Sequence, residues 1–301
     1  RWPHGAMNIL ESTLIAGANA LLMTGDLSHL DLVRSQLDFL WSLGRDEAGS
    51  FKMPKRHGEA GWFDFAAPDA RLWVHLYHLS QQPEDLSRLL RLPGRQSWAE
   101  SSSFGKGAQV SPQAWFAYTQ GENPDYPERA LERTFEEVNR RLELMRNDTG
   151  DPCEWDVHHW QNINPVVCEP LLQLTTGTPG VVYHGGLCHA RVRHFDPARR
   201  RPGLPEHVAA LVRSVATEHI VLQLVNTDPV AEHDVWVQAG AYGEHTFTTG
   251  RRLNAAGEED APIRVNSKLI RIQLGPAAQI HIRLGMDRFT NPPSYACPWD
   301  G

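Results

Sequence analysis

Apolar residues in the first half of the chain recur every three or four positions, the period of an amphipathic α-helix. The clearest stretch covers residues 7–24, and a second covers residues 28–41, with only Gly25 and Asp26 breaking the pattern between them. A connection this short predicts two helices that pack antiparallel as a hairpin. Ser28 is the expected N-cap of the second helix, because its hydroxyl can accept a hydrogen bond from a free backbone N–H.

The same pattern returns further along the chain. Helices are predicted over residues 68–79, 83–90, 111–120, 127–145 and 164–175. Several of them begin with proline, whose missing N–H costs nothing at the first helical position. Residues 45–68 contain glycines and Pro54 instead, which predicts a long loop with room for a small β-excursion. The result is an array of about seven helices in sequential hairpins.

After residues 178–180 (Thr-Pro-Gly), apolar and polar positions alternate with the period of two that is typical of strands. Such segments occupy residues 181–195, 219–225, 233–239, 244–249, 268–274 and 279–285. Residues 205–214 predict one short helix, and the proline-rich tail 289–301 predicts an extended strap. We therefore predict an α+β multidomain protein: a helical hairpin domain over 1–178 and an antiparallel β-sandwich-like domain over 179–301.

The composition of the chain argues against several classes of partner and cofactor. The chain has 29 basic and 36 acidic residues and a net charge of −7, which argues against a nucleic-acid partner. No apolar run approaches the roughly 20 residues that span a bilayer, so no membrane partner is expected. The four cysteines lie far apart, without the spacing of a zinc knuckle. Glycine-rich motifs for phosphates or dinucleotides are missing, so neither a metal nor a cofactor is predicted.

The segment 20–26 (ALLMTGD), followed by Leu30 and Asp31, resembles the hairpin turn of six-hairpin, or (α/α) toroid, carbohydrate-active enzymes. His29 stands where tyrosine is common in them. The resemblance implies a ring of helical hairpins followed by a β-sandwich, the order found in many glycoside hydrolases and some polysaccharide lyases. About seven helices are too few to close such a ring. We therefore expect an incomplete toroid, with an N-terminal part of the same polypeptide preceding Arg1.

The densest group of acidic and aromatic residues lies in the segment 151–169. Glycoside hydrolysis needs two carboxyl groups, one to protonate the leaving oxygen and one to act as base or nucleophile. A neighbouring aromatic ring can raise the pKa of the first by desolvation. We predict Asp156 and Glu154 as this catalytic pair, and sugar contacts from His158, His159 and Trp160. The alternative is a polar seam between domains, in which the acids cap a helix.

Two further groups are candidates for sugar binding. Trp62 and Asp64 lie in the glycine-containing loop, where a stacking ring and an acid occur together; the alternative is a hydrophobic plug with Asp64 as a turn residue. Tyr183 and His184 stand at the entry to the β domain. Tyrosine with histidine is a proton-transfer pair of many polysaccharide lyases, and the alternative for this pair is a solvated strand face.

These observations predict a carbohydrate-active protein, most similar to a glycoside hydrolase, acting on an oligo- or polysaccharide. Loops on one rim of a toroid meet at its centre, so we expect Trp62 or Asp64 to share a cleft with Asp156. Two alternatives stay open. One is a polysaccharide lyase using Tyr183 with His184, and the other is a non-catalytic glycan-binding or scaffold module. The acidic net charge favours neutral glycans over polyanions.

Overall fold

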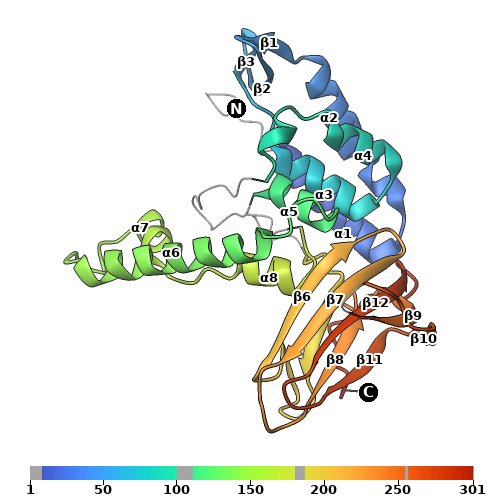
Figure 1. Ribbon diagram of the computed structural model, residues 1–301. Helices are drawn as coiled ribbons and strands as arrows, with labels where there is room; N and C mark the ends of the chain where they lie inside the picture. Colours follow the sequence, from blue (N-terminus) through green and yellow to red (C-terminus); the bar gives the residue numbers. More distant parts are fainter. Residues whose placement is uncertain (1–8, 100–110, 180–186, 255–256, 301) are drawn as a thin grey trace.

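The computed structural model describes residues 9–99, 111–179, 187–254 and 257–300, and shows a mixed α+β architecture (Figure 1). The helices come first along the chain, and most strands follow. The eight α-helices of the described residues are α1 (Ile9–Thr24), α2 (Asp31–Ser42), α3 (Ala70–Ser80), α4 (Pro83–Leu90), α5 (Pro112–Thr119), α6 (Tyr126–Asn147), α7 (Val157–Ile163) and α8 (Glu169–Thr176). None of these helices combines the length and the apolar character that crossing a bilayer requires.

The first hairpin forms as predicted, but its turn is capped differently. A 3-10 turn, η1 (Leu27–Leu30), separates α1 from α2. The carboxylate of Asp26 accepts a hydrogen bond from the Ser28 backbone N–H at 2.8 Å and caps η1. The second helix, α2, follows Leu30 without a side-chain cap, so the prediction of Ser28 as its N-cap is wrong. Gly25 adopts φ +74°, a left-handed conformation that glycine reaches without strain. The buried faces of α1, α2, α3 and α4 then share one hydrophobic core.

Residues 45–66 form a three-stranded antiparallel sheet where a long loop had been the main expectation. Its strands are β1 (Arg45–Glu47), β2 (Ser50–Gly58) and β3 (Gly61–Ala66). Aromatic contacts hold the sheet on α2: the rings of Trp41 and Phe51 stack at 4.3 Å, and Trp62 meets Phe39 edge-on at 5.8 Å. Cross-strand and inter-element aromatic packing of this kind stabilises strands that glycine and proline content alone would disfavour.

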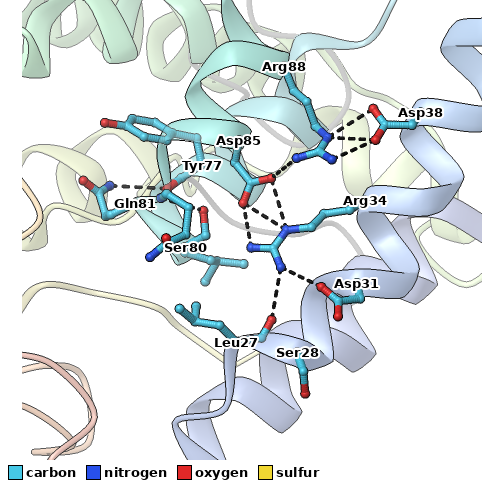
Figure 2. Close-up of polar contacts among 12 residues, drawn as sticks. Leu27, Ser28, Asp31, Arg34, Asp38, Tyr77, Ser80, Gln81, Asp85 and Arg88 are labelled. Carbon is cyan, nitrogen blue, oxygen red and sulfur yellow. Dashed lines mark hydrogen bonds and ion pairs between the residues drawn. The ribbon is translucent and has the colours of Figure 1, made fainter.

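A buried ion network joins α2 to α4 (Figure 2). Asp85 of α4 is only 1% exposed and accepts from both Arg34 and Arg88, each at 2.8 Å. Arg88 in turn donates to Asp38 of α2 at 2.8 Å, and Asp31 accepts from Arg34 at 2.7 Å. Asp85 is the buried carboxylate that both guanidinium groups share, so its charge is compensated only while these arginines stay in place.

The helix predicted over residues 164–175 begins later than expected, at Glu169, as α8, and an irregular link joins it to the preceding α7. Pro165 lies in that link, and Pro170 occupies the first turn of α8. Arg141 of α6 donates to the Asn164 carbonyl at 2.7 Å and thereby satisfies a group at the end of α7. The long α6 and the short α7 extend together away from the other helices (Figure 1).

The second part of the chain contains two antiparallel sheets. The strands are β4 (Val192–Asp196), β5 (Arg201–Pro202), β6 (Val208–Val215), β7 (His219–Asn226), β8 (His233–Ala239), β9 (Thr246–Leu253), β10 (Ile263–Ser267), β11 (Leu269–Leu274) and β12 (Gln279–Asp287). One sheet has the order β10-β9-β12-β7-β6 and the other β11-β8-β4-β5. Residues from both sheets form one core, in which Ile220, Leu222 and Leu224 are fully buried. This confirms the predicted alternation along residues 219–225.

The short helix predicted over residues 205–214 is wrong, because this segment contains the strand β6. It pairs with β7 along almost its whole length and buries Val208, Val212 and Val215 against the sheet. Two alanines in the middle had suggested a helix. A neighbouring strand with unpaired backbone groups and a hydrophobic face outweighs such local preferences.

The helical part and the β part meet where α5 and α8 pack on β6, and also at the C-terminal end of α3, at a contact that we call the seam. Arg191, just before β4, donates to the His78 carbonyl at 2.7 Å. Arg288, just after β12, donates to the carbonyls of Ser80, at 3.2 Å, and Leu79. The last carbonyls of a helix lack partners within the helix, and the negative end of its dipole favours cations. The seam therefore satisfies α3 and fixes both ends of the β part.

Two buried histidines flank this contact. The His194 ring donates through Nε2 to the Thr175 carbonyl at the end of α8, at 2.8 Å. His189 lies beside Arg191 and lines a small cavity at the seam. Burial lowers the pKa of each of these imidazoles to about 4, because the charged form loses its hydration. Both rings are therefore neutral at pH 7.

Replacing the buried carboxylate of the ion network should be costly. In Asp85→Asn, two guanidinium groups lose their shared counter-charge, and we expect the free energy of unfolding to fall by about 3 kcal/mol. The matched control is Asp31→Asn, whose side chain is 68% exposed; its expected loss is below about 1 kcal/mol. Urea denaturation of both variants measures the difference. Equal, small losses would show that the network contributes little.

Stability should also fall with acid. The folded-state pKa values of His189 and His194, about 4, lie below the ordinary value of 6.5. The unfolded chain therefore binds more protons between pH 6.5 and pH 4, so stability decreases as pH falls through this window. In His194→Gln, which retains a donor without a titrating ring, we expect a shallower decrease than in the wild type. Urea midpoints between pH 7 and pH 4.5 test this, with the exposed His29→Gln as control. Identical slopes in all three proteins would contradict the assignment.

Candidate functional site

A pocket of about 540 Å³ lies at the end of the β part farthest from the seam. This volume is in the range of small-molecule sites. The strand β4 begins beside Arg191 and ends at Asp196, which lies in the wall of the pocket. The remaining walls come from the β4–β5 turn, the β5–β6 loop, β8 and β11. The lining residues are Asp196, Pro197, Ala198, Arg199, Pro205, Glu206, His207, Glu232, His233, Asp234, Trp236 and Arg271.

The alternation of β8 places two of these side chains on the outer face of the sheet. Val235 and Val237 are fully buried in the core between the sheets. Successive side chains of a strand point to opposite faces, so Asp234 and Trp236 face outward. In the sheet register, Trp236 lies between Phe195 of β4 and Arg271 of β11. Of this row, the ring of Trp236 and the guanidinium group of Arg271 line the pocket, whereas Phe195 is fully buried against Trp299.

Two polar atoms beneath this surface have no hydrogen-bond partner among the described residues. They are the indole Nε1 of Trp236 and the Oδ1 of Asp234, and both are inaccessible to solvent. The other carboxylate oxygen of Asp234 accepts from Arg271 at 2.5 Å, which fixes the side chain. A buried donor or acceptor without a partner costs on the order of 1–3 kcal/mol. Because both atoms lie under the surface of the pocket wall, a ligand would reach them only if neighbouring side chains moved.

His207 contributes a strained backbone to the same pocket. Its φ is +64°, in the left-handed region that side chains larger than glycine rarely adopt. The Thr227 N–H and hydroxyl both donate to the His207 carbonyl, at 2.8 and 3.0 Å, and hold this conformation. Backbone strain of this kind is concentrated at functional sites. The His207 ring lies 5.9 Å from the ring of His233, so two imidazoles border the cavity together.

The electrostatics of the pocket are acidic. Hydrogen bonds from the backbone N–H groups of Ala231 and Val230 lower the pKa of Asp228 to about 2, so this carboxylate stays ionised and lies 3.4 Å from the His233 Nε2. The lining itself contains four carboxylates and two arginines. Within the described ranges, no three histidine, cysteine, aspartate or glutamate side chains are arranged to hold a metal ion. The arrangement offers donors, acceptors and a ring face to an uncharged polar ligand.

The predicted catalytic residues occupy a different place. Asp156 is the N-cap of α7: its Oδ1 accepts from the His159 backbone N–H at 2.8 Å, and its side chain is 70% exposed. That hydrogen bond lowers its pKa, as does a contact with His158. A catalytic acid needs a raised pKa, so this carboxyl group would suit a base. Glu154 is exposed in the preceding turn. The catalytic role of both stays a prediction.

The aromatic residues around α7 do come together. The His159 Nε2 lies 2.5 Å from the Asp148 carboxylate, and the ring of Trp155 stacks on the His159 ring at 4.2 Å. Trp160 meets Trp155 edge-on at 4.8 Å and is half exposed. Asp148 was missed by the sequence analysis because it precedes the acidic and aromatic segment. Its signal was the Asp-Thr-Gly turn that ends α6, where Asp148 accepts from the Gly150 N–H.

The candidates from the predicted 45–68 loop, Trp62 and Asp64, lie in the β1–β3 sheet and not beside α7. Trp62 is held between Phe39 and His57, and Asp64 forms a 3.3 Å ion pair with Arg56. The β1–β3 sheet lies at the top of the helical part, whereas the α6–α7 arm extends to the lower left (Figure 1). The two segments lie apart in this view, which does not support the expected cleft shared by Trp62 or Asp64 with Asp156. Tyr183 and His184 lie outside the described residues.

Comparisons with known proteins add a family without a described activity. A putative alpha-N-acetylgalactosaminidase from Bacillus halodurans is similar at 12% identity and a TM-score of 0.22, too low to indicate a shared fold. That match covers 87% of this chain and 55% of the other, so the chain spans about half the length of that protein. No curated protein matches the chain. A family model described as a domain of unknown function, DUF8034, matches residues 1–53 and 46–172, which is more than half of the 301 residues. The chain belongs to the DUF8034 family.

Proposed function

We propose that this chain binds a neutral carbohydrate in the pocket of its β part. The observation that carries the proposal is the outward-facing Trp236 in the wall of the pocket, beside the ion pair of Asp234 and Arg271. A sugar ring presents an apolar face to an indole and hydroxyl groups to nearby donors and acceptors. The cavity of about 540 Å³ has room for such a ring.

The charge of the pocket supports a neutral ligand over a polyanion. Four carboxylates and two arginines line it, so a uronate-containing chain would meet a negative potential. A polysaccharide lyase needs cations to neutralise the carboxylate of its substrate. The pocket thus favours glycan binding over lyase chemistry.

Hydrolysis is a second, finer proposal, with Asp156 and Glu154 as acid–base candidates. It is supported by the aromatic cluster around α7, where Trp155 and Trp160 offer ring faces next to the Asp148–His159 pair. His158, His159 and Trp160 would then contact the sugar, with Trp62 and Asp64 in a separate contact. In this proposal the helical hairpins are part of an (α/α) toroid, and a domain boundary lies near residue 178. The two main hydrophobic cores, one of helical residues and one of strand residues, support that boundary, and a third, smaller core joins α5, α6 and α8 to Leu211 of β6.

Glycan binding by the pocket can be tested with conservative variants. Trp236→Phe retains a ring and loses the N–H, and Asp234→Asn retains the shape and loses the charge. We expect each to weaken binding of a neutral oligosaccharide about tenfold, because phenylalanine offers a smaller ring face and asparagine no longer holds Arg271 by an ion pair. Titration calorimetry with a panel of neutral and uronate-containing oligosaccharides provides the measurement. The control is Trp160→Phe, in the exposed α7 cluster.

The pattern of losses separates the two proposals. Weaker binding in the Trp236 and Asp234 variants alone supports the pocket. Weaker binding in Trp160→Phe alone, together with loss of released reducing ends in Asp156→Asn, would move the site to α7. A wild-type chain that binds no member of the panel would contradict both.

A further inference from the structure

The long helix α6 buries a polar face along most of its length. Thr134, Glu137 and Arg141 recur every three or four positions, and each is at most 7% exposed. The Arg141 guanidinium donates to the Glu137 carboxylate at 2.6 Å and to the Asn164 carbonyl, at the end of α7, at 2.7 Å. These contacts fix the rotation of α6 about its own axis, because turning the helix would leave a buried ion pair without its partners.

The apolar residues of α6 consequently lie on a neighbouring face that is open to solvent. Phe135 is 66% exposed and Met145 is 45% exposed. Together with three partly buried residues they form a row that we call the α6 stripe: Leu131, Phe135, Val138, Leu142 and Met145. The spacing alternates between four and three residues, as in the contact row of a coiled coil. Soluble monomers seldom leave a continuous apolar row of this kind uncovered.

Charged and polar residues follow the stripe along its solvent side. They are Glu132, Asn139 and Arg146, one heptad apart, and all three are exposed. This flanking row therefore runs from a negative charge through a neutral amide to a positive charge, and it is complementary to a copy of itself that runs in the opposite direction. On the other side of the stripe, Thr134 and Arg141 are covered within the arm and offer nothing to a partner.

We propose that the α6 stripe binds the α6 stripe of a second copy of this chain, in an antiparallel coiled-coil contact with two-fold symmetry. One register satisfies the apolar positions: Phe135 lies opposite the partner's Met145, and Val138 lies opposite the partner's Leu142. The symmetry repeats both layers with the two copies exchanged. This proposal is independent of the carbohydrate site.

The same register pairs the flanking charges. Glu132 lies beside the partner's Arg146 at both ends of the contact, and Asn139 meets the partner's Asn139 close to the two-fold axis. A parallel arrangement would instead direct each flanking row at the covered side of the other helix. The antiparallel arrangement also keeps the two bodies at opposite ends of the paired helices, because α6 extends away from the rest of the molecule (Figure 1).

Charge-swapped variants of the full chain test the register. Glu132→Arg and Arg146→Glu each bring like charges together at both ends of the dimer, so the dissociation constant of either variant alone should rise at least about fivefold. An equimolar mixture of the two variants should recover the wild-type affinity, because every arginine in the mixed dimer then faces a glutamate. Sedimentation equilibrium measures these constants, which we expect in the micromolar range for a contact of this length.

A matched control makes the same charge change on another face of α6. Glu136 is exposed and pairs with Arg133 at 2.8 Å, so Glu136→Arg should associate as the wild type does. Phe135→Ser removes the exposed ring from the stripe and should raise the dissociation constant at least about tenfold. Circular dichroism should show unchanged helix content in this variant, because the ring is mostly exposed in the single chain.

Three results would overturn the proposal. The first is a wild-type chain that stays monomeric up to its solubility limit. The second is a dimer that responds neither to the charge swaps nor to Phe135→Ser, because that dimer would use another surface. The third comes from hydroxyl-radical footprinting: a monomer in which Phe135 and Met145 are protected from oxidation would show that another segment of the same polypeptide covers the stripe.

Discussion

The C-terminal turn of α3 is the point on which the arrangement of the molecule depends. A helix must end with carbonyl groups that have no partner within the helix. Here those of His78, Leu79 and Ser80 accept hydrogen bonds from Arg191 and Arg288. One arginine precedes the first strand of the β part and the other follows the last strand. The last carbonyl groups of α3 thereby receive their hydrogen bonds from both ends of a part of the chain that is distant in sequence.

This contact also decides where the candidate functional site can lie. The strands run away from α3, so the loops at their far end are free of contacts with the helices. Those loops and the outer face of β8 form the pocket around Trp236 and His207. The charged seam and the acidic pocket, with its strained backbone at His207, thus lie at opposite ends of the β part. Backbone strain at His207 is tolerable because the sheets beneath it share a continuous core.

The sequence predicted what depends on neighbours along the chain. Asp69 and Ser111 begin helices where their side chains can cap them, and the alternation in β7 gave its buried face correctly. The prediction from the sequence failed where contacts with residues far away in the chain determine the structure. The alanines of β6 favour a helix until β7 offers a complete set of backbone partners. The pocket could not be predicted, because its residues come from separate strands and loops and only the sheet register assembles them. Asp156 looked catalytic by composition, yet its carboxylate caps α7.

The central claim is that the seam couples the helical core to the β core. Differential scanning calorimetry of the double variant Arg191→Gln, Arg288→Gln tests it most directly. The wild-type chain should unfold in a single transition, since loss of either part exposes the buried end of α3. In the variant, the two cores should unfold separately, and two transitions should appear with the first at a lower temperature. A double variant that still unfolds in one transition, at the wild-type temperature, would contradict the account.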